Sequence, residues 1–198
     1  MRRAARGDQD AFMVLYRRHQ AALYRFALRM TGQAWAAEEI VQDVFMILLR
    51  APKKYEPERG ALGAFLFGIA RNRILKHSER VPREISLDQP KGNGAAPPPS
   101  AVNSFTPAQW AEQRQRAERV RAAVLDLPVE FREAVVLCEL EELSYQQAAQ
   151  LLRCPIGTIR SRLHRARTLL SSKLEVLRGP TEQLGTEVGA PSHKGSSR

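Results

Sequence analysis

Residues 143–167 decide the fold, and they read LSYQQAAQLLRCPIGTIRSRLHRAR. Ser144 is followed three residues later by Gln147, the pattern of a capping box at the start of a helix. Cys154-Pro155 then interrupts that helix and starts a second one. The stretch therefore predicts a helix-turn-helix, in which two short helices meet at a tight turn and the second enters the major groove of DNA.

The two predicted helices divide their residues between core and solvent. The small Ala148 and Ala149 allow the helices to approach closely, and three apolar residues hold the second helix on the core: Ile156, Ile159 and Leu163. With 3.6 residues per turn, four polar residues share the outward face: Arg160, Ser161, His164 and Arg165. Arginine can donate two hydrogen bonds to guanine. We expect Arg162 and Arg167 to pair with phosphates or with the acidic helix at 130–142. The alternative is an ordinary basic, solvated surface helix.

Apolar residues recur at spacings of three and four along most of the remaining chain, which predicts helices. In the N-terminal part these helices cover 9–30, 36–49 and 61–80. In the C-terminal part, one covers 109–125, Pro128 suits the first position of the next, and the last one ends near residue 177. No stretch shows the alternation of a strand. The sequence therefore predicts an all-α protein of two small helical bundles.

Proline and glycine separate the two bundles. Residues 82–107 are rich in both and have few large apolar residues, so we expect a flexible linker there. The predicted domains are then 1–81 and 108–178, and residues 179–198 form a tail that we expect to be disordered.

The charge of the chain indicates its class of partner. The net charge is +10, and it is concentrated in residues 51–83, with eight bases and three acids, and 153–178, with seven bases and one acid. Two separate basic stretches favour a polyanionic partner, nucleic acid or an anionic membrane surface. No apolar run is long enough to cross a bilayer and the first residues do not resemble a signal peptide, so we expect a cytoplasmic protein without membrane insertion.

The sequence offers no chemistry of an enzyme. It contains no nucleophile with a nearby base, no phosphate-binding loop and no cluster of metal ligands, and its four histidines are scattered. Cys138 and Cys154 are too few for a disulfide scaffold. We therefore expect no catalysis, no cofactor, no metal and no small-molecule substrate.

Three motifs carry a resemblance to a known family. Residues 143–167, with Leu127-Pro128 upstream, closely resemble region 4 of bacterial sigma factors of the sigma-70 family. Residues 37–45, AEEIVQDVF, resemble the polymerase-binding part of region 2, and residues 65–72, FLFGIARN, its promoter-melting part. Two regions in this order, with only a linker between them, resemble the extracytoplasmic-function (ECF) group.

The resemblance implies partners and roles for three groups of residues. Core RNA polymerase, through its β′ and β subunits, and promoter DNA are the implied partners, with an anti-sigma factor as inhibitor. The implied contacts to the β′ coiled coil are Glu38, Glu39, Gln42 and Asp43. Those that read and melt the minus-10 element are Arg71, Asn72, Arg73, Lys76, His77 and Arg80. Those that read the minus-35 element are Thr158, Arg160, Ser161, Arg162, His164, Arg165 and Arg167.

The sequence departs from the family pattern at two positions. Phe65 stands where tryptophan is common, and Lys76 stands where an aspartate often precedes the histidine. Phe65 and Phe67 are expected in the core rather than as stacking platforms for bases. Lys76 puts the minus-10 preference in doubt.

Two other classes of protein compete with a sigma factor. One is a two-domain regulator with a helix-turn-helix like that of response-regulator output domains, which would bind duplex DNA alone. The other is an unrelated protein that uses its charge to bind nucleic acid or a membrane surface. Promoter-specific initiation with core polymerase separates a sigma factor from both.

Overall fold

Every regular element in the described residues of the computed structural model (1, 3–80 and 106–178) is helical, so the all-α prediction is confirmed. Residues 82–105 of the predicted linker (82–107) and the predicted tail at 179–198 lie outside the described residues. The main helices are α1 (Gln9–Thr31), α2 (Ala34–Arg50), α3 (Leu62–Arg80), α4 (Pro107–Leu125), α5 (Val129–Val135), α6 (Tyr145–Leu152) and α7 (Ile156–Arg178). Short 3₁₀ turns occur at η1 (Ala4–Arg6), η2 (Pro52–Lys54) and η3 (Pro57–Arg59), and a π-turn, η5 (Val136–Leu140), continues α5.

Both ends of α1 follow from local chemistry. At its start, the Asp8 carboxylate accepts a hydrogen bond from the Ala11 N–H at 2.9 Å, which satisfies one of the free donors of the first turn. This bond, together with one from Arg3, lowers the pKa of Asp8. At its end, Gly32 adopts φ +74° and its N–H donates to the Leu28 carbonyl. Glycine takes this left-handed conformation without steric cost, so α1 ends here, one residue beyond the predicted range of 9–30.

Capping boxes start α4 and α6. The predicted box of Ser144 and Gln147 is present at α6. An equivalent box, with Thr106 as the cap and Gln109 as its partner, starts α4 at Pro107. Pro107 was predicted to end the linker, yet a proline that follows a capping residue suits the first helical position. The prediction for Pro128 was wrong in the opposite sense. Pro128 was expected at the first helical position, but it is the N-cap residue of α5, and the helix begins at Val129.

Helices α1, α2 and α3 form the first bundle. Its fully buried side chains include Leu23, Phe26, Val44 and Leu66. Phe67 is also buried and packs edge-on against Phe26, with ring centroids 5.2 Å apart. Phe65 is half-buried against Tyr55. These positions agree with the expectation that both phenylalanines belong to the core.

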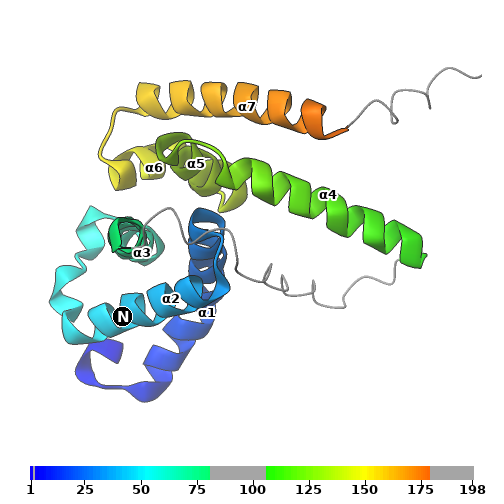
Figure 1. Ribbon diagram of the computed structural model, residues 1–198. Coiled ribbons are helices and arrows are strands. Elements are labelled where there is room, and N and C mark those ends of the chain that lie inside the picture. The colour runs from blue at the N-terminus through cyan, green and yellow to red at the C-terminus, as the bar shows by residue number, and fades with distance from the viewer. Residues whose placement is uncertain (2, 81–105, 179–198) are drawn as a thin grey trace, which may run out of the picture.

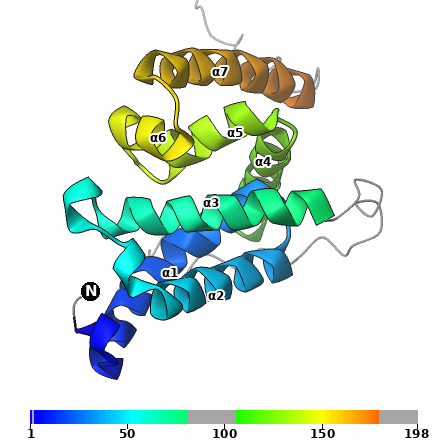
Figure 2. The ribbon, with the colours of Figure 1, turned by 90° about the vertical axis from the view of Figure 1, so that its left-hand side faces the viewer.

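The second bundle holds the helix-turn-helix. In Figure 2, α7 covers a layer formed by α5 and α6. Ile159 and Leu163 of α7 are buried, as are Ala148 and Ala149 of α6, so the expected close approach of the two helices is confirmed. Ile156 does not anchor α7 as expected, because 40% of it is exposed at the first position of the helix.

The two bundles lie against each other. Helix α3 contacts α6, and α1 contacts both α4 and η5, so that one cluster of buried apolar residues contains members of both bundles (Figures 1 and 2). The N-terminal half of α4 projects away from both (Figure 1). The sequence predicted two bundles but did not predict how they meet.

Candidate nucleic-acid interface

The outer face of α7 is open to solvent. Arg160, Ser161, His164 and Arg165 are all exposed, and the Ser161 hydroxyl donates to the Thr158 carbonyl at 3.0 Å. Thr158 and Arg162 are half-buried at the edges of this face. Arginine, hydroxyl and imidazole side chains are therefore presented together on the second helix of a helix-turn-helix, the helix that can enter the major groove.

Arg167 lies beside this face but has a partner within the bundle. Its Nη2 donates to Glu139 Oε1 at 2.6 Å, and this hydrogen bond raises the pKa of Arg167 further above its ordinary value. Of the two partners expected for Arg167, phosphate or the acidic segment at 130–142, the structure contains the second.

The basic face of α3 is partly occupied. Arg71 donates through Nε and Nη2 to the two oxygens of Glu133, at 2.6 and 3.1 Å, and Glu133 is 1% exposed. Arg73 pairs with Asp43 at 3.3 Å. Asn72 and Lys76 of the same helix are exposed. Two of the six predicted minus-10 residues are therefore bound to carboxylates.

The end of α3 holds the last two predicted minus-10 residues. His77 is half-buried and its ring lies 5.1 Å from that of Trp35 at the start of α2. Arg80 ends the helix, and its side chain lies outside the described residues.

The predicted polymerase-binding residues share α2. Glu38, Glu39 and Gln42 are exposed. Asp43 is half-exposed because it faces Arg73 on α3. The ion pair between Asp43 and Arg73 thus joins the predicted polymerase surface to the predicted minus-10 surface.

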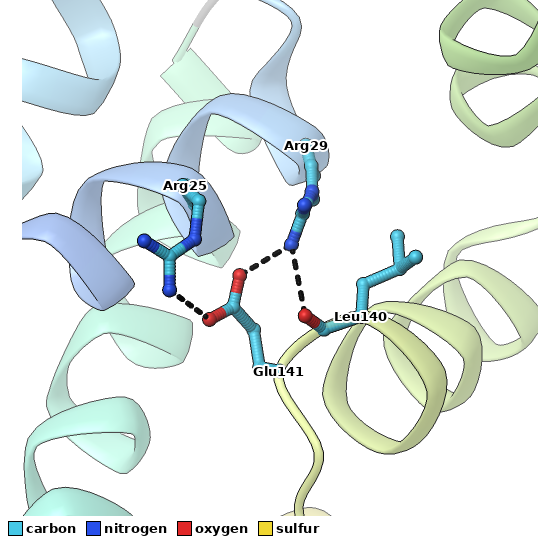
Figure 3. A network of polar contacts seen from close by, with 4 residues as sticks. All are labelled: Arg25, Arg29, Leu140 and Glu141. Atoms are coloured by element: carbon cyan, nitrogen blue, oxygen red, sulfur yellow. Dashed lines mark hydrogen bonds and ion pairs between the residues drawn. The ribbon is translucent and has the colours of Figure 1, made fainter. Parts of the chain in front are cut away.

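An ionic cluster links α1 to the end of η5 (Figure 3). Glu141 receives hydrogen bonds from Arg25, at 3.2 Å, and from Arg29, which also donates to the Leu140 carbonyl at 3.3 Å. The Glu141 side chain is 2% exposed. Burial raises the pKa of Glu141, and the two arginines oppose that shift only in part.

Two further contacts lie near this cluster. Arg132 of α5 donates to the Met30 carbonyl, at 2.8 Å, at the end of α1. It also donates to the carbonyl of Leu125, the last residue of α4, and to that of Leu127 just beyond it, so one guanidinium satisfies carbonyls at two helix ends. A Cβ at Gly32 would lie 3.0 Å from Leu125 Cδ1, which shows how closely the bundles approach.

These contacts between the bundles are not predictable from the sequence pattern. The three ion pairs that α1 and α3 make with the second bundle join residues 62 to 116 positions apart, so no local spacing indicates them. The only available signal was the acidic character of the segment at 130–142. No helix in the described ranges is long and apolar enough to span a membrane. Within those same ranges, no three histidine, cysteine, aspartate or glutamate side chains gather closely enough to hold a metal ion.

The comparisons with known proteins agree with both halves of the chain. Residues 15–83 match the family model for sigma-70 region 2, and residues 117–170 match that for sigma-70 region 4. The ECF RNA polymerase sigma factor SigE of Mycolicibacterium smegmatis is 34% identical over 86% of this chain and 65% of its own length. The ECF RNA polymerase sigma factor EcfG of Rhodopseudomonas palustris is 34% identical over 78% of this chain and 80% of its own length.

A solved structure matches across both bundles. The sigma factor RpoE from Bartonella quintana, in complex with the anti-sigma factor NepR, has a TM-score of 0.64 and 28% identity, over 84% of this chain and 98% of that one. The protein belongs to the ECF group of the sigma-70 family. Proteins of this family bind core RNA polymerase and direct promoter-specific initiation of transcription, and this chain has both regions that the activity uses.

Proposed function

We propose that the exposed face of α7 reads the minus-35 element of a promoter while the first bundle opens the minus-10 element. The observation that carries this proposal is the exposed group of Arg160, Ser161, His164 and Arg165 on the second helix of the helix-turn-helix. Such side chains can hydrogen-bond base edges and phosphates in the major groove. Thr158, Arg162 and Arg167 border this group and would contact the DNA backbone.

In the first bundle, Asn72 and Lys76 would meet the minus-10 DNA first, because they are exposed on α3. Arg71, Arg73, His77 and Arg80 complete the proposed surface. Asn72 can hydrogen-bond a base edge, and the cations can follow the backbone of a single strand. The free energy for melting comes from contacts made only to opened DNA, so the protein needs no catalytic group and acts as a non-enzymatic factor.

The exposed polar side chains of α2 would bind the β′ subunit of core polymerase. Glu39 and Gln42 are better test positions than Asp43, because replacing Asp43 would also release Arg73. We expect a Glu39→Arg, Gln42→Ala variant to recover less core polymerase in a pull-down. A matched Glu112→Arg, Gln113→Ala variant on the exposed part of α4 should recover the normal amount. Equal recovery by both variants would exclude the α2 surface.

The regulator that fits this protein is an anti-sigma factor, by analogy with the complex of RpoE and NepR. It would act in the cytoplasm, where core polymerase is found. Purification of the tagged protein from its native host should recover such a partner in stoichiometric amount before induction.

Run-off transcription with core polymerase tests the main proposal. Asn72→Ala should reduce the permanganate reactivity of minus-10 thymines in the open complex, while the holoenzyme still assembles. A variant at Ser78, which is exposed six residues further along α3, is the control and should melt the promoter normally. A regulator that binds duplex DNA alone would bind the promoter equally well with and without core polymerase. That result would overturn the proposal.

A further inference from the structure

The contacts between the bundles join cations of region 2 to acids of region 4. Arg25 and Arg29 of α1 bind Glu141, and Arg71 of α3 binds Glu133. Both carboxylate side chains are only 2% exposed. An apolar surface would be sufficient to pack two bundles together. The presence of five ionised groups in this contact therefore needs a physical explanation.

The three arginines have the geometry of an anion site. Arg25 and Arg29 are four residues apart and therefore project from the same side of α1, where both reach one carboxylate (Figure 3). Arg71 uses the two-pronged arrangement of guanidinium and carboxylate, with bonds of 2.6 and 3.1 Å. The same fork can bind a phosphate, because a phosphate also offers two acceptor oxygens to the two parallel N–H donors.

The acids come from one continuous helical run. Glu133 lies in α5, and Glu141 directly follows the π-turn η5, where its N–H donates to the Val136 carbonyl at 2.9 Å. A π-turn closes bonds between residues five apart, so it turns through a smaller angle per residue than an α-helix. The two carboxylates thereby face region 2 together.

We propose that Arg25, Arg29 and Arg71 form a phosphate-binding face for promoter DNA, and that Glu133 and Glu141 occupy this face when the two regions are docked. The proposal rests on the proposed function, since it adds Arg25 and Arg29 to the DNA surface of region 2. Docked region 4 then competes with DNA, and separating the regions uncovers the three-arginine face.

The docked state is reversible on physical grounds. Removing ionised groups from water costs several kcal/mol per ion, and the attraction within the pairs returns much of that cost but not a large surplus. Burial raises the pKa of Glu141 even beside two arginines, which means that the charged carboxylate is held there at a cost. A polyanion that offers phosphates to the same arginines can therefore replace the acids.

The test uses two variants that break the same ion pairs from opposite sides. A Glu133→Gln, Glu141→Gln chain should bind labelled oligodeoxythymidine at least about tenfold more tightly than the unaltered full-length chain, because the face is uncovered. An Arg25→Ala, Arg29→Ala chain should bind it more weakly, although its regions also separate. Each lost phosphate contact to a single strand lowers the slope of log affinity against log salt by about 0.7, so this slope should fall by about 1.4.

Matched variants keep the result interpretable. Glu130→Gln removes an exposed acid from α5 and should change neither affinity nor salt slope. An Arg25→Lys, Arg29→Lys chain keeps both charges and should keep the salt slope, which covers the case in which the alanine variant unfolds. Separation of the regions is followed by energy transfer between dyes on α2 and α7.

Two results would overturn the inference. If the alanine variant binds the strand more tightly, as the glutamine variant does, the arginines serve only to dock the regions. If the glutamine variant separates the regions without a gain in affinity, the acids do not block a DNA site. Neither result touches the run-off assay with Asn72→Ala, so the proposed function would stand or fall separately.

Discussion

The two cationic helices α3 and α7 differ in what their arginines face. On α7, Arg160 and Arg165 project into solvent. On α3, Arg71 is held by Glu133 of the other bundle, and Arg73 by Asp43 of its own. The docked molecule therefore exposes these arginines of α7, while part of the basic face of α3 is occupied by carboxylates. The net charge of a segment does not reveal whether its cations are available.

The largest effect is expected at the exposed face of α7. Arg160→Ala with Arg165→Ala should reduce run-off transcription from a minus-35-dependent promoter by about a hundredfold or more. Each arginine that reads a base contributes about 1–3 kcal/mol of discrimination, and here both are free to do so. Because both side chains are exposed, the melting temperature should stay unchanged.

The control for this prediction removes equal charge elsewhere. Arg114→Ala with Arg116→Ala takes two exposed arginines from α4, each in a surface pair with a glutamate of the same helix. Surface pairs of this kind contribute little to stability. If the control loses as much transcription as the α7 variant, the effect comes from total charge and not from the α7 surface.

A second, smaller effect concerns the contact between the bundles. Gly32 and Gly7 both adopt a left-handed conformation, with φ of +74° and +88°. A Cβ at Gly32 would lie 3.0 Å from Leu125, whereas one at Gly7 would meet nothing within 4 Å. Replacement of either glycine by alanine should lower the free energy of unfolding by about 1–2 kcal/mol through backbone strain alone.

The difference between the two glycine variants then measures the docking contact. Urea unfolding should give a larger loss for Gly32→Ala than for Gly7→Ala, because Leu125 must move. Gly32→Ala should also increase the separation of the regions in the energy-transfer assay. Equal losses, with no change in separation, would mean that the bundles are not docked in solution through this contact.

Most of the fold could be predicted because its signals are local. Apolar residues every third or fourth position located the helices, and the box of Ser144 and Gln147 placed the start of α6. The ends of the helices were within about two residues of those observed, since caps such as Gly32 act over a single turn. The errors at Pro107 and Pro128 concern whether a proline lies just inside or just outside a helix. A shift of the boundary by a single residue changes the answer.

The candidate site was harder to predict, for a physical reason. Exposed Arg160 and Arg165 follow from the angle between successive residues of a helix. The pairs of Arg71 with Glu133 and of Arg29 with Glu141 depend on how two bundles meet, and no periodicity encodes a partner at such a separation. The π-turn η5, which Glu141 directly follows, also has no characteristic residue pattern by which the sequence could indicate it.

Oxidising conditions are expected to have no effect at Cys138. This residue lies in η5, between Glu133 and Glu141 in the sequence. If Cys138 were oxidised, the contact between the bundles that holds Arg71 against Glu133 would be disturbed, and separation of the bundles would depend on redox conditions. Burial, with a contribution from Glu139, raises the pKa of the Cys138 thiol to about 11. At pH 8 only about one thiol in a thousand is then ionised, and the thiolate is the form that oxidants attack.

A Cys154→Ser chain, in which Cys138 is the remaining thiol, tests this. Peroxide at pH 8 should leave its transcription activity and its energy-transfer signal unchanged, and a maleimide should label Cys138 slowly until urea unfolds the protein. The labelling rate of the folded chain should rise about tenfold per pH unit up to the region of the pKa. Rapid labelling at pH 7, or separation of the regions by peroxide, would contradict this prediction and would show that η5 opens often enough to expose the thiol.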